Sequence, residues 1–273
     1  MDNRITALIK LLDDSDPQTV HTAMSELLKH GAELEPYLAE HHESENPALR
    51  RRIHQLQSII TLRQRRTEFL RIINDPKTTL AEGLIEVHLQ WYDNDSRRAL
   101  EEQWQEFVEA ANRYNPRNLG GIAYFMRKSG FAVPSSSDIH ADHYCLGPVL
   151  EDHIGADFIL SAIVTAAGTE LGVELKIARM LDNFLIMDQY GNGLNPRNNW
   201  QLQPNINITQ CEFWSNAKIL KLASLMLFQY AVCSDSFRYI STIGHSLTGL
   251  TDDDPLDFLP YPYRPPDDSG DNI

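Results

Sequence analysis

Four residues between positions 140 and 145 have side chains that could carry chemistry. His140, Asp142, His143 and Cys145 lie in one short segment, and their imidazole, carboxylate and thiol groups are common metal ligands. Their spacing does not place both histidines and the cysteine on one helical face, and the sequence places no fourth ligand. Solvated loop residues are therefore the favoured interpretation, and we expect no metal and no cofactor. Cys145 as the nucleophile of a thiol enzyme is an alternative that requires a histidine brought close by folding.

The cysteines also bear on the compartment in which the protein folds. Cys145, Cys211 and Cys233 are odd in number and show neither a CxxC pair nor the Cys/His spacing of a zinc site. This usage indicates a reducing cytoplasm rather than a disulfide framework. Lys10 interrupts the first apolar stretch, and no later run approaches the about 20 apolar residues of a membrane span. We therefore expect a cytoplasmic protein that is neither secreted nor embedded in a membrane.

The strongest charge feature is a basic segment between positions 49 and 71. It carries seven arginines against one acidic residue, Glu68. Six of them form a candidate partner surface: Arg50, Arg51, Arg52, Arg63, Arg65 and Arg66. The simpler interpretation is a solvated helix face paired with acids elsewhere, and docking of the acidic C-terminal residues is another alternative. Nucleic acid is disfavoured as a partner because the whole chain, with 24 Lys and Arg against 38 Asp and Glu, has a net charge of −14 and repels phosphate.

Residues 1–112 are expected to form helices that begin at repeated Asx-Pro pairs. Asp16-Pro17, Asn46-Pro47 and Asp75-Pro76 recur at separations of 30 and 29 residues. Asp or Asn at an N-cap accepts a backbone N–H, and Pro at the first helical position has no N–H to leave unsatisfied. The apolar residues after each pair have helical spacing. This pattern predicts helical hairpins resembling HEAT repeats, with a plain helical bundle as the alternative.

The following segment predicts a buried helix and then a small sheet. Asp157 opens a strongly apolar helix that Gly172 closes, and apolar residues run nearly all round it, as in a central helix. Val173, Leu175 and Ile177 then alternate with polar residues, and residues 184–187 form a second apolar run before a glycine-rich turn. Two further helices are expected near residues 216–233 and 237–247.

Six short motifs occur in a fixed order through this part of the chain. They are Ser129-Gly130-Phe131, Tyr144 with Val149-Leu150, the six residues from Gly155 to Leu160, Leu171-Gly172-Val173, Asn183-Phe184 and Asn195-Pro196. In this order and spacing they resemble the SirB family of bacterial transglutaminase-like proteins. The resemblance implies a papain-like transglutaminase fold preceded by HEAT-like helices, and it covers nearly the whole chain.

The resemblance also points to three positions where the catalytic residues of such enzymes would stand. The chemistry needs a thiolate at the start of the central helix, a His on the facing strand and an Asp or Asn on the next strand to orient that His. This chain has Asp157, Asn183 and Asn195 there. Two of the three chemical roles are missing, so we expect no catalytic residue among these relic-cleft positions.

Together these patterns predict an α+β, mostly helical protein in three parts. A HEAT-like helical region, residues 1–112, packs on a degenerate transglutaminase-like domain, residues 113–250. Residues 251–273 contain seven Asp, one Arg and five Pro and predict an extended or disordered acidic tail. We expect non-catalytic binding of a protein or peptide, which could be regulatory. A cryptic cysteine hydrolase or acyltransferase that uses unrecognised residues is the alternative.

Overall fold

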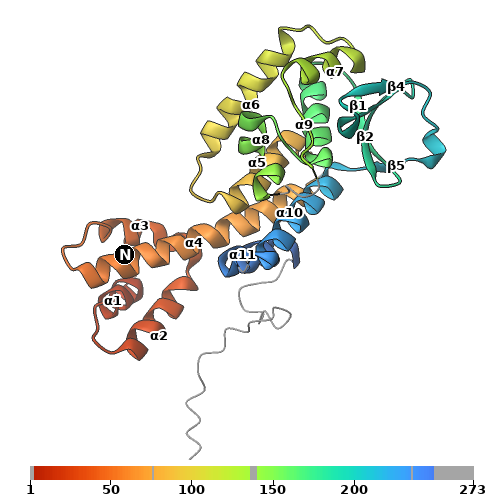
Figure 1. Cartoon of the computed structure of the whole chain (residues 1–273). Helices are drawn as coiled ribbons and strands as arrows, with labels where there is room; N and C mark the ends of the chain where they lie inside the picture. The colour runs from red at the N-terminus through yellow and green to blue at the C-terminus, as the bar shows by residue number, and fades with distance from the viewer. Residues whose placement is uncertain (1–2, 76, 136–139, 235, 249–273) are drawn as a thin grey trace, which may run out of the picture.

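Helices make up most of the molecule, and one small antiparallel sheet lies beside them (Figure 1). The structure is a computed structural model that describes residues 3–75, 77–135, 140–234 and 236–248. This architecture confirms the expected α+β, mostly helical class. The expected acidic tail, residues 251–273, lies outside the described residues. Within the described ranges, no helix is both long enough and apolar enough to cross a bilayer.

The first helices form a small unit with its own core. Its elements are α1 (Asn3–Leu11), α2 (Pro17–Leu28), the 3-10 turn Gly31–Leu34, α3 (Glu35–Glu40) and the first half of α4 (Pro47–Asn74). Its buried apolar residues run from Ile5 to Ile60. Asp16 and Asn46 cap α2 and α4, and each side chain accepts two backbone N–H groups. The first two Asx-Pro pairs therefore start helices, as predicted.

The third Asx-Pro pair follows the end of a helix and does not begin one, so the predicted helix start at Asp75 is wrong. Asp75 is the C-cap of α4, and the next helix, α5 (Leu80–Trp91), begins five residues after it. Thr79 caps α5: its hydroxyl accepts the N–H of Glu82, and the Glu82 carboxylate accepts the N–H of Thr79. This reciprocal pair is a capping box, which satisfies two backbone donors at once. Pro76 itself lies outside the described residues.

A larger core holds the remaining helices and one face of the sheet. The helices are α5, α6 (Arg97–Asn112), α7 (Leu119–Lys128), α8 (Leu146–Asp152), α9 (Asp157–Glu170), α10 (Asn216–Cys233) and α11 (Phe237–Thr248), with a 3-10 turn at Ala141–Tyr144. Every residue of α5 except Glu82 is buried, because α4, α9 and α10 surround it. This core begins at Phe69 and includes α5 and α6. The division between cores thus lies within α4, whereas we had expected a domain boundary at 112/113.

Helix α9 is the central helix of this larger core, as expected. It packs against the sheet on one side and against α5 and α10 on the other (Figure 1). Its residues are buried nearly all round, including Asp157 at its start. Gly172 follows the helix with a φ of +73°, a left-handed conformation that glycine adopts without strain. The chain then turns directly into the sheet.

The sheet has five antiparallel strands in the order β4-β3-β2-β1-β5. They are β1 (Leu175–Met180), β2 (Asn183–Asp188), β3 (Gly193–Asn195), β4 (Gln201–Gln203) and β5 (Glu212–Trp214), with 3-10 turns at Pro196–Asn198 and Ile208–Gln210. Ile186 pairs with Ile177 on one side and Leu194 on the other. Side chains alternate between faces, so Phe184 and Ile186 join the core around α9, whereas Leu185 forms a small cluster on the opposite face.

Candidate functional site

A cavity of about 280 Å³ opens at the N-terminal end of α9, and we call it the Asp157 pocket. Four aromatic residues from separate segments form its wall: Tyr144, Phe158, Phe184 and Trp214. The Tyr144 and Phe158 rings stack with centroids 5.9 Å apart. The Phe184 ring centroid lies 5.7 Å from that of Phe158. The Phe184 and Trp214 rings meet edge to face, with centroids 5.0 Å apart. These successive contacts fix the rings in a preformed apolar surface.

An ion pair lies at the N-terminal end of α9, where Asp157 meets Arg197. Asp157 is only 4% exposed, and its Oδ1 accepts the N–H of Phe158 at 2.8 Å. Its Oδ2 accepts the Nε–H of Arg197 at 2.5 Å. Arg197 comes from the 3-10 turn after β3, where Asn195 Oδ1 accepts its backbone N–H at 2.9 Å. Both oxygens of this buried carboxylate therefore have partners, and the guanidinium neutralises its charge.

The three relic-cleft positions do not form one cleft. Asn183 begins β2 and alternates with Phe184, so it lies on the face of the sheet away from α9. Asn195 ends β3 and supports the turn that carries Arg197. Of the three, only Asp157 lines the pocket. Asn183 and Asn195 lie on paired strands, β2 and β3, but motif spacing does not fix the face on which Asn183 lies, because a shift of one residue reverses every side chain.

The rim of the pocket contains a second guanidinium, that of Arg179 on β1. Its Nε–H donates to the Leu181 carbonyl at 3.1 Å, and one Nη lies 3.4 Å from the carboxylate of Asp182, whose side chain is 98% exposed. The Arg179 Cζ lies 5.9 Å from the centre of the Trp214 ring, over which Lys218 Nζ lies at 4.1 Å. The pocket thus combines an aromatic wall with cations at its edge.

The pocket phenol of Tyr144 stays protonated over the physiological range. Burial raises the pKa of Tyr144, and the nearby carboxylate of Asp157 raises it further. A protonated phenol can donate its O–H as well as accept a hydrogen bond. Tyr144 therefore adds a neutral hydroxyl to the aromatic wall, in which the indole N–H of Trp214 is also polar.

No sequence pattern singles out Arg179, Arg197 or Trp214. Each of them comes from a short element whose side-chain direction depends on the folded sheet. Arg197 directly follows the Asn195-Pro196 motif, and a lone basic residue after an Asn-Pro turn is the available signal. Trp214 lies on a strand of three residues, which is too short for an alternating pattern.

The structure gives the residues between positions 140 and 145 different surroundings. Cys145 is fully buried, and burial raises the pKa of its thiol well above the ordinary value. Asp142 accepts the phenol O–H of Tyr92 at 2.6 Å, and His143 Nδ1 accepts the backbone N–H of His140 at 3.1 Å. Among the described residues, no three His, Cys, Asp or Glu side chains are grouped to hold a metal ion. From this segment, His143 and Tyr144 reach the Asp157 pocket.

Part of the candidate arginine surface has a structural use. The guanidinium of Arg52 donates to the carbonyls of Leu12 and Asp14, just after α1. Arg63 donates to the carbonyl of Leu28, the last residue of α2, at 3.2 Å. Both arginines satisfy carbonyls at helix ends and tie α4 to the helices before it. Arg50 and Arg51 are exposed, whereas the side chains of Arg65 and Arg66 lie outside the described residues.

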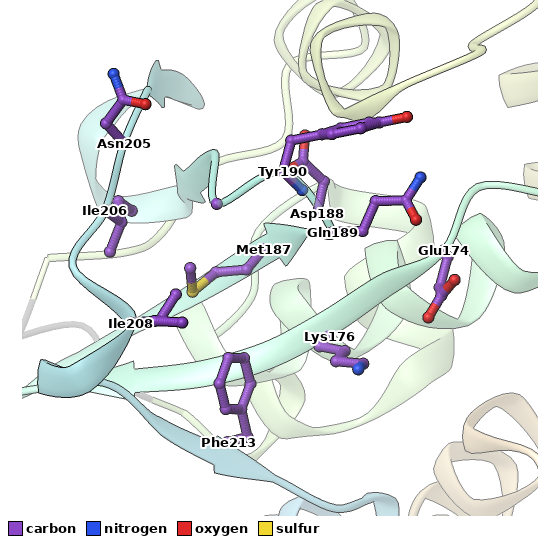
Figure 2. A pocket seen from close by; sticks show the side chains of 11 residues that line it. Glu174, Lys176, Met187, Asp188, Gln189, Tyr190, Asn205, Ile206, Ile208 and Phe213 are labelled. Atoms are coloured by element: carbon purple, nitrogen blue, oxygen red, sulfur yellow. The ribbon is translucent and has the colours of Figure 1, made fainter.

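A second cavity, of about 510 Å³, lies on the face of the sheet away from α9, and we call it the outer groove (Figure 2). Met187 lies at its centre, and Tyr190 and Phe213 lie on opposite sides (Figure 2). Tyr190 is 76% exposed. Glu174 and Lys176 bring opposite charges to the rim. The outer groove is larger but lacks buried polar groups that converge on one point, so the Asp157 pocket is the stronger candidate.

Comparison of this chain with protein-family models, with curated proteins and with solved structures finds no match. The residues of the Asp157 pocket are therefore the guide to function.

Proposed function

We propose that this chain binds a segment of another protein, or a peptide, without catalysing a reaction on it, and that the Asp157 pocket receives one of its side chains. The observation that supports this most is the ion pair of Asp157 with Arg197 at the start of α9. The resemblance to the SirB family would place a nucleophile there, and a neutralised carboxylate with both oxygens engaged is a poor substitute. The cysteine usage supports a cytoplasmic setting.

The preformed aromatic wall supports binding as the role of this pocket. Aromatic side chains supply large apolar contact areas and lose little conformational entropy when a ligand binds. The contacts among Phe158, Phe184 and Trp214 already hold the wall in place. A partner would thus meet a rigid site and would not have to order it.

The alternative of a cryptic cysteine hydrolase or acyltransferase has less support. The thiol of Cys145 is fully buried, and its raised pKa keeps it protonated. The thiolate is the reactive form of cysteine, so this thiol is both inaccessible and unreactive in the folded protein.

Selection from a random peptide library tests the proposal. Peptides selected on the full chain are measured on Met226→Trp, which fills the pocket from α10, and on Tyr190→Ser, which alters the exposed outer groove. We expect affinity to fall at least about 10-fold in Met226→Trp, as for a buried contact residue, and to stay unchanged in Tyr190→Ser. Peptides that bind Met226→Trp as tightly as the wild type would place the binding site elsewhere.

A further inference from the structure

The size of the Asp157 pocket limits what part of a ligand can enter it. Its volume of about 280 Å³ lies just below the about 300–1,000 Å³ of sites for drug-sized ligands. A single side chain fits such a space, whereas a folded segment does not. Because aromatic rings pair favourably in edge-to-face and offset geometries, a wall of four rings favours an aromatic guest over an aliphatic one.

The charges at the rim of the pocket then decide which polar group the ligand carries beside its aromatic ring. Among the described residues, the contacts of Arg179 use two of its five N–H donors, one of them at 3.4 Å to Asp182. The Asp182 side chain is almost fully exposed, so water and salt weaken its hold on the guanidinium. Arg179 can therefore donate to an incoming carboxylate, and a guanidinium binds a carboxylate with two parallel hydrogen bonds.

A cationic ligand fits the same surroundings poorly. The Trp214 ring, which would attract a cation, already lies near Lys218 Nζ at 4.1 Å and Arg179 Cζ at 5.9 Å. The carboxylate of Asp157 has both oxygens engaged by Phe158 and Arg197. Among the described residues that line the pocket, the one other carboxylate is that of Asp182, which is exposed and already near Arg179, so an added cation would meet two like charges and little compensation.

From these contacts we infer that the Asp157 pocket selects an aromatic group that carries a carboxylate within a few bonds of the ring, with the ring against Phe158 and Phe184 and the carboxylate on Arg179. An aromatic residue at a free C-terminus has this chemistry. The inference rests on the proposed function, because it specifies the ligand of the same pocket.

Three small probes that differ in charge test this inference. They are 3-phenylpropionate, its neutral isostere 3-phenylpropanamide and the cation 3-phenylpropylammonium, each titrated into the full chain with NMR detection. We expect the propionate to bind at least about 10-fold more tightly than the other two, which is the scale of one charge-assisted hydrogen-bonded pair. Added salt should lower the affinity for the propionate and leave the affinity for the amide unchanged.

Two variants assign this effect to Arg179. Arg179→Gln should lower propionate affinity to that of the amide and leave amide binding unchanged. Arg98→Gln removes the same charge from an exposed site on α6, where Arg98 pairs with Glu102, and should change neither affinity. If Arg179→Gln lowers the affinities for the propionate and the amide equally, the pocket has collapsed and no carboxylate contact has been shown. This result would overturn the inference.

The remaining outcomes separate this inference from the proposed function. If the amide binds as tightly as the propionate, or the ammonium binds best, the carboxylate inference is wrong and the pocket remains a binding site. If no probe binds but library peptides depend on position 226, the ligand class is wrong and the proposed function stands. If neither the probes nor the library peptides depend on the pocket, both proposals are overturned.

Discussion

His88 lies on α5 with only 1% of its surface exposed, and its neighbours define its protonation state. The backbone N–H of Gly147 donates to Nδ1 at 3.2 Å, and Nε2 lies 2.9 Å from a carboxylate oxygen of Asp95. Because a backbone N–H can only donate, Nδ1 carries no proton and the neutral ring holds its proton on Nε2. A single imidazole thus joins α5, the loop after it and the start of α8.

This arrangement predicts that the protein loses stability as the pH falls. Burial lowers the pKa of His88, and the contact with Asp95 only partly opposes this effect. Below about pH 6.5, the ordinary value for histidine, the unfolded chain binds a proton that the folded chain excludes. The free energy of unfolding, measured in urea at several pH values, should therefore fall progressively below pH 6.5.

Two substitutions test whether His88 causes this loss of stability at low pH. In His88→Gln the protein should be less stable overall, with a weaker dependence on pH than the wild type. His21→Gln, at an exposed position of α2, should keep the wild-type dependence. Parallel pH curves for the wild type and His88→Gln would contradict this assignment.

At the scale of elements, the contact between α9 and the sheet depends on a glycine near the end of the helix. The backbone of Gly168 approaches the turn that leads into β1, and its carbonyl accepts the N–H of Val173 at 2.7 Å. A Cβ at this position would lie 2.9 Å from the carbonyl oxygen of Val173 and 2.7 Å from a methyl group of Leu175. The absence of a side chain therefore lets the chain turn directly from the central helix into the sheet.

Gly168→Ala should destabilise the protein by about 1–3 kcal/mol, although alanine is the better helix former. The reason is that the Val173 carbonyl belongs to the backbone and cannot rotate away. Gly120→Ala in α7 is the matched control: among the described atoms outside the adjacent helix backbone, its Cβ would meet the Asn118 side-chain oxygen at 3.3 Å and no backbone carbonyl, so it should be neutral or up to about 1 kcal/mol more stable. Urea unfolding measures both, and equal effects would rule out this close-contact explanation.

Local patterns predicted the elements around α9 but not the sides on which their residues lie. The apolar run from Asp157 and the alternation through Leu175 and Ile177 are signals within one segment, so α9 and β1 were predicted correctly. The face of Asn183 depends on pairing with other strands, and the Asp157–Arg197 contact joins residues 40 positions apart. The site therefore required the fold, because no local pattern encodes a contact between distant segments.

At the scale of the whole molecule, α4 contributes residues to two hydrophobic cores that stay separate. The small core ends at Ile60 and the larger one begins at Phe69, so residues 61–68 of the helix lie between them (Figure 1). At about 1.5 Å per residue, this 28-residue helix is about 42 Å long. Among the side chains that the structure describes, ten buried apolar ones form the small core, which is few for independent stability.

The tryptophans make the two cores separable by spectroscopy. Trp91, Trp104, Trp200 and Trp214 all belong to the larger unit, whereas far-UV circular dichroism reports helices of both. Leu27→Ala should cost the small core about 2–5 kcal/mol, so that helix signal is lost at low urea while tryptophan fluorescence stays native. Leu160→Ala in α9 should instead shift the fluorescence transition. Superimposable curves from the two probes in Leu27→Ala would show a single cooperative unit.

The bridging helix also bears on how this chain could change over evolution. Within the described residues, α4 is the one element that contributes to both cores, so the packing route from a substitution near Ile53 to the Asp157 pocket runs along this helix. Mutational effects in the two parts should then add independently. Residues 1–60 could acquire a new partner, or accumulate changes rapidly, while the pocket keeps its ligand.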